Sequence, residues 1–123
     1  MTIKTFEDII AWQKSRELFI IVNKSLVNCK NYSYKDQLLR ATLSISNNIA
    51  EGFDRGSNKE LRQFLIISRG SAAEVRSMLL IAEDLNLISS ENLQNSMILV
   101  KDISKLLTGF IKSINGQQKT DNG

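Results

Sequence analysis

The feature that most constrains this chain is a helical spacing of apolar and small residues along four successive segments, none of which contains a proline. The spacing alternates between three and four positions, which places these residues on one face of an α-helix. The four seams are Trp12, Ser15, Phe19, Val22, Leu26, Cys29; Leu38, Ala41, Ile45, Asn48, Gly52; Leu61, Phe64, Ser68, Ser71, Val75, Met78, Ala82, Leu85; and Leu93, Val100, Ile103, Leu107, Phe110, Ile114. Each segment therefore predicts an amphipathic helix, and no strand pattern competes with it.

Signals for helix starts precede the four segments. At each one a hydroxyl side chain comes shortly before an acidic residue, an arrangement that caps a helix N-terminus. These signals are Thr5 with Asp8, Ser33 with Asp36, Ser57 with Glu60, and Ser89 or Ser90 with Glu91. The connections are short, and short loops make consecutive helices antiparallel. We therefore expect an all-α fold, an antiparallel up-down-up-down four-helix bundle.

The length of 123 residues suits one domain, and we expect the bundle to occupy residues 1–115. Residues 116–123, GQQKTDNG, contain no apolar residue, so we expect a flexible C-terminal tail. The longest apolar runs, 18–22 and 78–82, are far shorter than the roughly 20 residues that cross a bilayer. The N-terminus also lacks the layout of a signal peptide. We expect a cytoplasmic protein without membrane contact.

The composition excludes several kinds of enzyme. The sequence has no histidine and a single cysteine, Cys29, so it offers no Ser-His or Cys-His pair, no internal disulfide and no thiolate metal cluster. Diiron sites in helical bundles use Glu-x-x-His motifs, which this sequence also lacks. We therefore expect no catalysis, no metal, no cofactor and no small-molecule substrate.

Four arginines, Arg55, Arg62, Arg69 and Arg76, recur at seven-residue intervals. Seven residues make nearly two helical turns and advance about 10.5 Å, so these side chains should form a ridge that Lys59 extends. Guanidinium groups suit phosphate, and such a ridge is typical of a surface that follows a nucleic-acid backbone. In the simpler interpretation, the arginines pair with neighbouring acids or form salt bridges between subunits.

A weaker basic row lies in the fourth segment, at Lys101, Lys105 and Lys112. The net charge of +3 permits a polyanionic partner without requiring one. Aromatic residues lie on the predicted core seams and do not alternate with either row, as they would in a base-stacking platform. Any nucleic acid would therefore be recognised by shape and backbone.

Polar residues lie beside the seam near the end of the second segment. They are Asn48 and Glu51, followed by Gly52, with Ser44, Ser68 and Ser71 at neighbouring heptad-like positions of the second and third segments. Buried polar groups need hydrogen-bond partners, so we interpret this set as a polar layer that specifies helix register. Gly70 lies mid-helix, where glycine costs about 1 kcal/mol relative to alanine, and we expect it to permit close helix packing.

Glu51 has two interpretations. In a catalytic site it would be a general base or metal ligand, with Glu60 or Glu74 as the second carboxylate. Because the histidine ligands of such sites are missing, we favour a structural role in which Glu51 reaches Arg55 one turn further on. Ser57 and Glu60 would then cap the third helix.

The middle of the chain resembles a known family. The motifs are Ser44–Gly52, SISNNIAEG, followed by Arg55, Ser57, Glu60, Phe64-Leu65 and Gly70-Ser71, with Phe6-Glu7-Asp8 and Trp12-Gln13-Lys14 in the first segment. This ordered set resembles the four-helix bundle family encoded within intervening sequences of bacterial 23S ribosomal RNA genes. The chain departs from the family pattern at Ser46, where proline is frequent, and at Leu61, where an aromatic residue is frequent.

The resemblance implies a small bacterial protein with no known catalysis that assembles as a ring-like homopentamer. The family is similar in fold to the accessory variability proteins of diversity-generating retroelements, which are basic barrels that bind nucleic acid and a reverse transcriptase. We therefore expect a non-catalytic homo-oligomer that binds RNA or a ribonucleoprotein through its basic ridge. The alternative is a protein scaffold whose arginines serve only subunit contacts.

Overall fold

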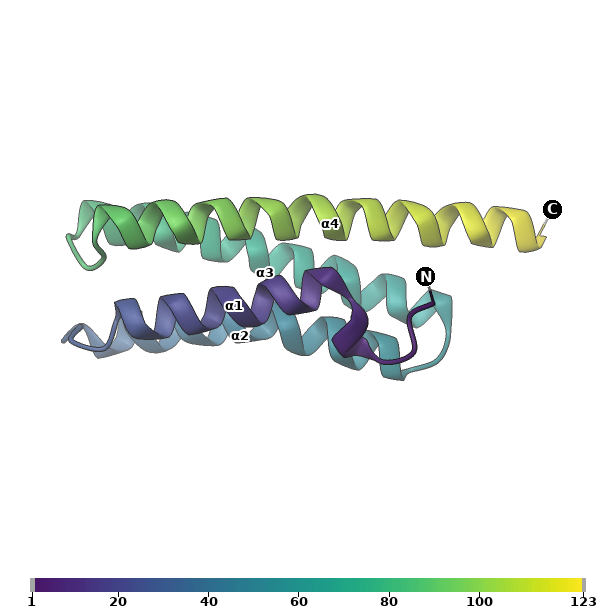
Figure 1. Cartoon of the computed structure of the whole chain (residues 1–123), viewed down its shortest axis with the longest axis horizontal. Coiled ribbons are helices and arrows are strands. Elements are labelled where there is room, and N and C mark those ends of the chain that lie inside the picture. The colour runs from purple at the N-terminus through teal and green to yellow at the C-terminus, as the bar shows by residue number, and fades with distance from the viewer. Residues whose placement is uncertain (1, 123) are drawn as a thin grey trace.

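The computed structural model describes residues 2–122, with the side chains of residues 2–115. A short 3-10 helix, η1 (Phe6–Asp8), precedes four α-helices: α1 (Ile10–Ser25), α2 (Tyr32–Asp54), α3 (Asn58–Asp84) and α4 (Ser90–Asn122). The four helices lie alongside one another, and α1 packs against α4 as well as against α2, which closes the bundle (Figure 1). The predicted all-α, antiparallel up-down-up-down four-helix bundle is confirmed.

The C-terminal tail and membrane-spanning segments are both subjects of sequence predictions. The flexible tail expected at residues 116–123 lies outside the residues whose side chains the structure describes, so it stays a prediction. Among the helices of residues 2–122, none is long and apolar enough to span a bilayer.

Polar side chains fix where the helices begin. The Ser57 hydroxyl accepts a hydrogen bond from the Glu60 backbone N–H at 3.2 Å, as predicted for α3. The start of α2 differs from the prediction, because Asn31, not Ser33, accepts from the Tyr34 N–H at 3.3 Å. Asparagine is as good an N-cap residue as serine, and Asn31 lies where the backbone turns into the helix.

The N-terminal signal caps a different element from the one expected. The Asp8 carboxylate accepts hydrogen bonds from the backbone N–H groups of Lys4, at 3.0 Å, and Thr5, at 3.2 Å. These two hydrogen bonds hold the pKa of Asp8 below its ordinary value. The Asp8 hydrogen bonds thus cap the N-terminal end of η1, and α1 begins only at Ile10.

The buried stripe of α1 is displaced from the predicted seam at two positions. Trp12 and Phe19 are only partly buried, whereas their neighbours Ala11 and Leu18 are buried. This displacement arises because α1 packs against both α2 and α4, so its buried stripe lies between the two contact lines. The seam of α3 ends before Leu85, which is half-exposed because the helix itself ends at Asp84.

Gly52 is the glycine that permits close packing, and the prediction for Gly70 is wrong. A Cβ atom on Gly52 would lie 2.6 Å from the Cβ of Phe64, so α2 and α3 approach too closely there for any larger residue. A Cβ on Gly70 would meet nothing within 4 Å. Gly70 lies on the exposed side of α3, away from the helices that flank it.

The polar layer predicted between α2 and α3 is present. The Ser44 and Ser71 hydroxyls lie 2.9 Å apart, and the Asn48 amide donates to the Ser44 hydroxyl at 2.9 Å. The buried Ser68 hydroxyl donates to the carbonyl oxygen of Ile45 at 2.8 Å. The Ser44–Ser71 and Ser68–Ile45 bonds join the two helices near the middle of their contact and fix their register, while the Asn48–Ser44 bond within α2 orients the Ser44 hydroxyl.

Candidate nucleic-acid interface

The four spaced arginines lie on two helices. Arg55 follows the last residue of α2, whereas Arg62, Arg69 and Arg76 lie on α3. On α3 each of the three directly follows a buried residue, so their side chains start at the border of the core-facing stripe. The structure therefore brings three of the four into one row and separates Arg55 from them by a turn.

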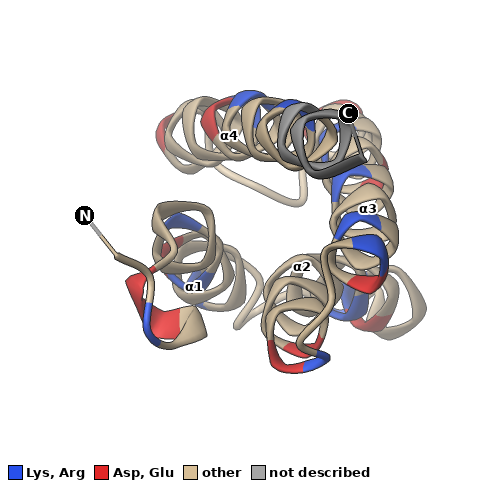
Figure 2. Ribbon diagram, turned by 90° about the vertical axis from the view of Figure 1, so that its right-hand side faces the viewer, with Lys and Arg blue, Asp and Glu red and all other residues tan. Residues whose placement is uncertain are grey.

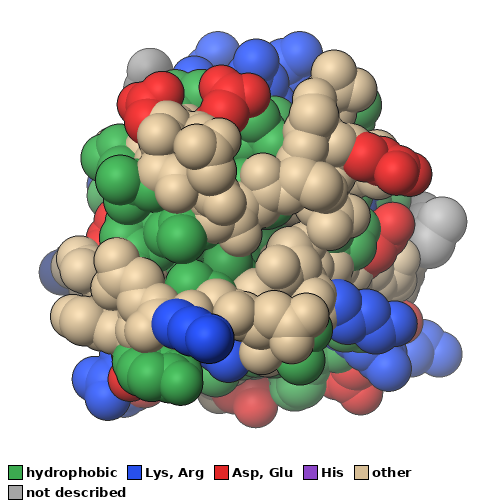
Figure 3. Space-filling view, turned by 90° about the vertical axis from the view of Figure 1, so that its left-hand side faces the viewer, with side chains coloured by type: hydrophobic (Ala, Val, Ile, Leu, Met, Phe, Trp, Pro, Cys, Tyr) green, Lys and Arg blue, Asp and Glu red, His purple; other side chains and the backbone are tan. Residues whose placement is uncertain are grey.

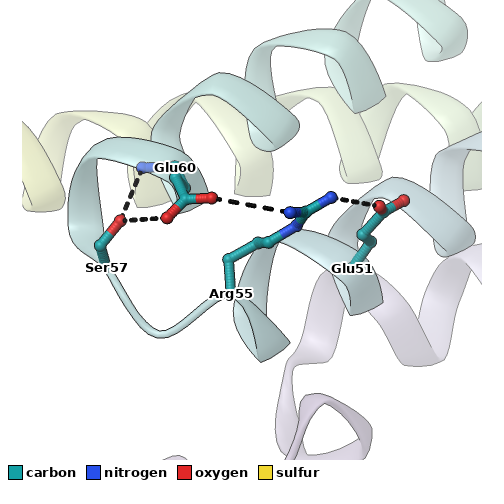
Figure 4. Close-up of polar contacts among 4 residues, drawn as sticks. All are labelled: Glu51, Arg55, Ser57 and Glu60. Atoms are coloured by element: carbon teal, nitrogen blue, oxygen red, sulfur yellow. Dashed lines mark hydrogen bonds and ion pairs between the residues drawn. The ribbon is translucent and has the colours of Figure 1, made fainter.

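Arg55 closes the turn between α2 and α3. Its Nη2 atom lies 2.9 Å from Oε1 of Glu51, and its Nη1 atom lies 3.9 Å from Oε2 of Glu60 (Figure 4). Its guanidinium carbon also lies 5.3 Å from the centre of the Phe64 ring. The predicted contact of Glu51 with Arg55 is confirmed, and this geometry gives Arg55 a structural role.

The Ser57 cap belongs to the same turn. The Ser57 hydroxyl donates to Oε1 of Glu60 at 3.1 Å while it accepts from the Glu60 backbone (Figure 4). Glu60 thus contacts both the capping residue and Arg55. Because all of these side chains are substantially exposed, the network stabilises the turn only modestly.

Arg62 and Arg69 cross from α3 to α4. The Nε atom of Arg62 donates to the side-chain oxygen of Asn115 at 2.6 Å, and Nη1 of Arg69 donates to the Thr108 hydroxyl at 3.3 Å. Both arginines are partly buried. Their partners are neutral, so these bonds orient the guanidinium groups without cancelling their charge.

The register of these two contacts places the third arginine. Seven residues forward on α3, from Arg62 to Arg69, match seven residues backward on α4, from Asn115 to Thr108. Continuing this antiparallel register by one step brings Arg76 to the level of Lys101. Both residues are exposed. Arg76 therefore lies opposite another cation, whereas Arg62 and Arg69 lie opposite neutral hydrogen-bond acceptors on α4.

The predicted lysine row of α4 lies on the same side of the molecule. Lys105 and Lys112, with Ser104, Thr108 and Gly109, line a shallow depression of about 360 Å³. Thr108 is also the residue that Arg69 contacts, so the depression adjoins the arginine row. The ribbon coloured by residue type shows Lys and Arg positions along both α3 and α4 in the end-on view (Figure 2).

We define the basic face as the three arginines of α3 and the three lysines of α4. They are Arg62, Arg69, Arg76, Lys101, Lys105 and Lys112. Within residues 2–115, ion pairs join Lys14 to Asp102 and Arg55 to two glutamates, and no pair involves a member of the basic face. Lys59, the remaining predicted residue, is exposed in the first turn of α3.

The neutral partners of Arg62 and Arg69 do not stand out in the sequence. Asn115 and Thr108 lie on a different helix, and each is an ordinary polar residue on its own. The signal that could have found them is their separation by seven residues, the same interval that separates Arg62 from Arg69.

Aromatic side chains gather on the other side of the bundle. The ring centres of Phe6 and Trp12 lie 5.1 Å apart in an edge-to-face arrangement, and the guanidinium carbon of Arg16 lies 5.9 Å from the centre of the Trp12 ring. With Phe19, they line an apolar groove of about 390 Å³ between α1 and α2. The depression beside Lys105 and Lys112 has no aromatic residue in its described lining.

The fold and this surface define a small all-α bundle protein with a basic face on two adjacent helices. In residues 2–115, no group of three or more His, Cys, Asp or Glu side chains is placed to hold a metal ion. The side chains that the structure brings together are suited to contacting anions.

Comparison with known proteins identifies the family. The model of the 23S rRNA-intervening sequence protein family matches residues 7–109. The chain belongs to this family, as its sequence motifs predict. Its structure is similar to the crystal structure of a protein of unknown function from the S23 ribosomal protein family of Bacteroides thetaiotaomicron. The TM-score is 0.77 with 31% sequence identity, and the match covers 84% of this chain and 99% of that chain. None of the curated proteins matches the chain.

Proposed function

We propose that this protein is a non-catalytic homo-oligomeric bundle that binds RNA, alone or in a ribonucleoprotein, through the basic face. The observation that carries the proposal is the way Arg62 and Arg69 are held. Each is fixed at the border of α3 and α4 by a neutral acceptor, at 2.6 Å and 3.3 Å respectively, with no acidic partner among residues 2–115.

This arrangement leaves the arginines able to bind phosphate. A guanidinium has five N–H donors, and the contact with Asn115 uses only the Nε of Arg62. The fork of Nη groups remains available for bidentate contact with a phosphate. Because the side chain is already ordered, binding loses less conformational entropy than it would with a mobile side chain.

Membership of the family is the reason to propose RNA as the ligand over other polyanions. The family description refers to an intervening sequence of 23S rRNA, which supports an RNA context for its members. The described lining of the depression on α4 contains no aromatic residue, which supports contact with the sugar–phosphate backbone over stacking on bases.

The test is RNA binding measured across salt concentration for the wild type and for a variant with Arg62, Arg69 and Arg76 changed together to glutamine. We expect the variant to lose at least about tenfold in affinity. Its slope of log affinity against log salt should fall by about two, because each phosphate contact contributes roughly 0.7 to 0.9.

A matched control changes Lys24, Lys30 and Arg40 to glutamine. These residues are exposed and lie outside the basic face, and either triple change lowers the net charge from +3 to zero. The control should keep both the affinity and the salt slope. If wild type and variant bind equally, or if neither binds, the proposal fails. A change in oligomer mass without a change in RNA binding would instead favour the protein scaffold.

Exposed apolar side chains support the homo-oligomer. The apolar groove between α1 and α2 includes Ile20 and Leu43, which are 43% and 41% exposed. Hydrophobic side chains also reach the surface at the end of the bundle that holds the α1–α2 and α3–α4 connections (Figure 3), where Val27 and Leu85 are at least half-exposed. Exposed apolar side chains gathered in this way are typical of surfaces that contact another protein.

A further inference from the structure

We propose that the depression on α4 is a seat for a single phosphodiester group of the bound RNA backbone. The inference rests on the proposed function and adds to it a defined anion position, where a diffuse basic surface would have none. The seat is lined by Lys105 and Lys112 and by three small or hydroxyl-bearing residues, Ser104, Thr108 and Gly109. Arg69 reaches it from α3 through its contact with Thr108.

The charges around the seat all have one sign. Lys105 and Lys112 are two turns apart, about 10.5 Å along the helix axis, and both are exposed. The depression is lined by no acidic residue among those described. An anion placed between the two lysines and Arg69 would be attracted by all three positive charges.

Two hydroxyl groups, those of Ser104 and Thr108, also line the depression. Thr108 accepts from Arg69, so its own proton remains for donation to another acceptor. The Ser104 hydroxyl makes no hydrogen bond to the side chains or backbone of residues 2–115. A phosphodiester oxygen is an acceptor that satisfies such hydroxyl and ammonium donors together.

Gly109 gives the seat its shape. Glycine inside a helix costs about 1 kcal/mol relative to alanine, and here the packing of the bundle does not require it, since a Cβ atom would meet nothing within 4 Å. Its missing side chain leaves the hollow between Lys105 and Lys112 open. Gly70 is equally open, but it lies on α3 outside this depression.

These two glycines supply a matched experiment. Gly109→Leu fills the seat, whereas Gly70→Leu makes the same change at an exposed helical glycine elsewhere. Neither side chain meets a neighbour at its Cβ, and both replace glycine with a stronger helix former, so both variants should fold. Binding is measured by fluorescence anisotropy with a labelled mixed-sequence RNA duplex, and folding by circular dichroism.

We expect Gly109→Leu to weaken binding by roughly tenfold, since phosphate could no longer approach the hydroxyls and lysines together. Gly70→Leu should bind as wild type does. A second variant, Thr108→Val, keeps the shape of the side chain but removes its hydroxyl, and it should weaken binding by about threefold to tenfold.

Three outcomes overturn the inference. The first is wild-type binding by both Gly109→Leu and Thr108→Val, and the second is an equal loss in Gly109→Leu and Gly70→Leu. In either case, a loss of binding in the triple arginine variant would leave the proposed function standing while the seat is rejected. The third is a wild-type protein that binds no RNA, which rejects the proposed function and the seat together.

Discussion

Ser96 on α4 carries a hydroxyl group that is fully buried and has no hydrogen-bond partner within the described part of the chain. Burying a polar group without a partner costs free energy, because its hydrogen bonds to water are lost and not replaced. Ser68 on α3 is buried to the same degree but donates to Ile45 across the helix interface. The two serines therefore have opposite effects on stability.

We predict that Ser96→Ala raises the free energy of unfolding by about 1 kcal/mol, because the uncompensated hydroxyl is removed. Ser68→Ala should lower it by about 1 kcal/mol, since the bond that joins α3 to α2 is lost. Urea denaturation of both variants beside the wild type measures the difference. Destabilisation by both changes would show that the Ser96 hydroxyl has a partner in solution.

Individual roles were predictable from the sequence where both partners lie within one turn of each other. Glu51 with Arg55 and Ser57 with Glu60 are such pairs, since helical geometry fixes contacts three or four residues apart. The partner of Arg62 lies on another helix, and the sequence alone does not state the register that brings Asn115 to it.

Close packing of α2 against α3 depends on Gly52, at the last full turn before the connection. A Cβ there would overlap with Phe64 at 2.6 Å, an approach that real side chains do not tolerate. The contact is made by the Cβ of Phe64, which cannot move without its backbone. Any larger residue at this position must therefore push the two helices apart.

We predict that Gly52→Ala destabilises the protein by about 1 to 3 kcal/mol, the usual cost of overpacking a core. Gly70→Ala should do the opposite and stabilise it by up to about 1 kcal/mol through helix propensity. Thermal unfolding followed by circular dichroism compares the two. Equal stabilisation by both substitutions would contradict the close approach at Gly52.

At the scale of the elements, the sequence predicts the number, type and order of the helices well, because each seam is long and free of proline. It predicts the function of a glycine poorly. Gly52 and Gly70 both lie in helical segments, and only the position of the neighbouring helix distinguishes a close contact from an open surface. The displaced stripe of α1 has the same origin, since two neighbours share it.

The molecule has an apolar groove between α1 and α2 and the basic face on α3 and α4. We predict a homo-oligomer in solution, because the apolar groove and the exposed hydrophobic side chains of the connections would be covered by another copy. Light scattering after size exclusion measures the mass. A clean monomer of 13.9 kDa at micromolar concentration would contradict the prediction.

The opposite placement of the apolar groove and the basic face has a consequence for avidity. Copies that associate through their α1–α2 sides would leave the α3–α4 sides turned away from the contact (Figure 2). Each assembly would then present several basic faces to one strand, and the second contact would form at a high effective concentration. Weak RNA binding by each basic face would then be enough for tight binding by the whole assembly, provided that the RNA is long enough to contact two faces.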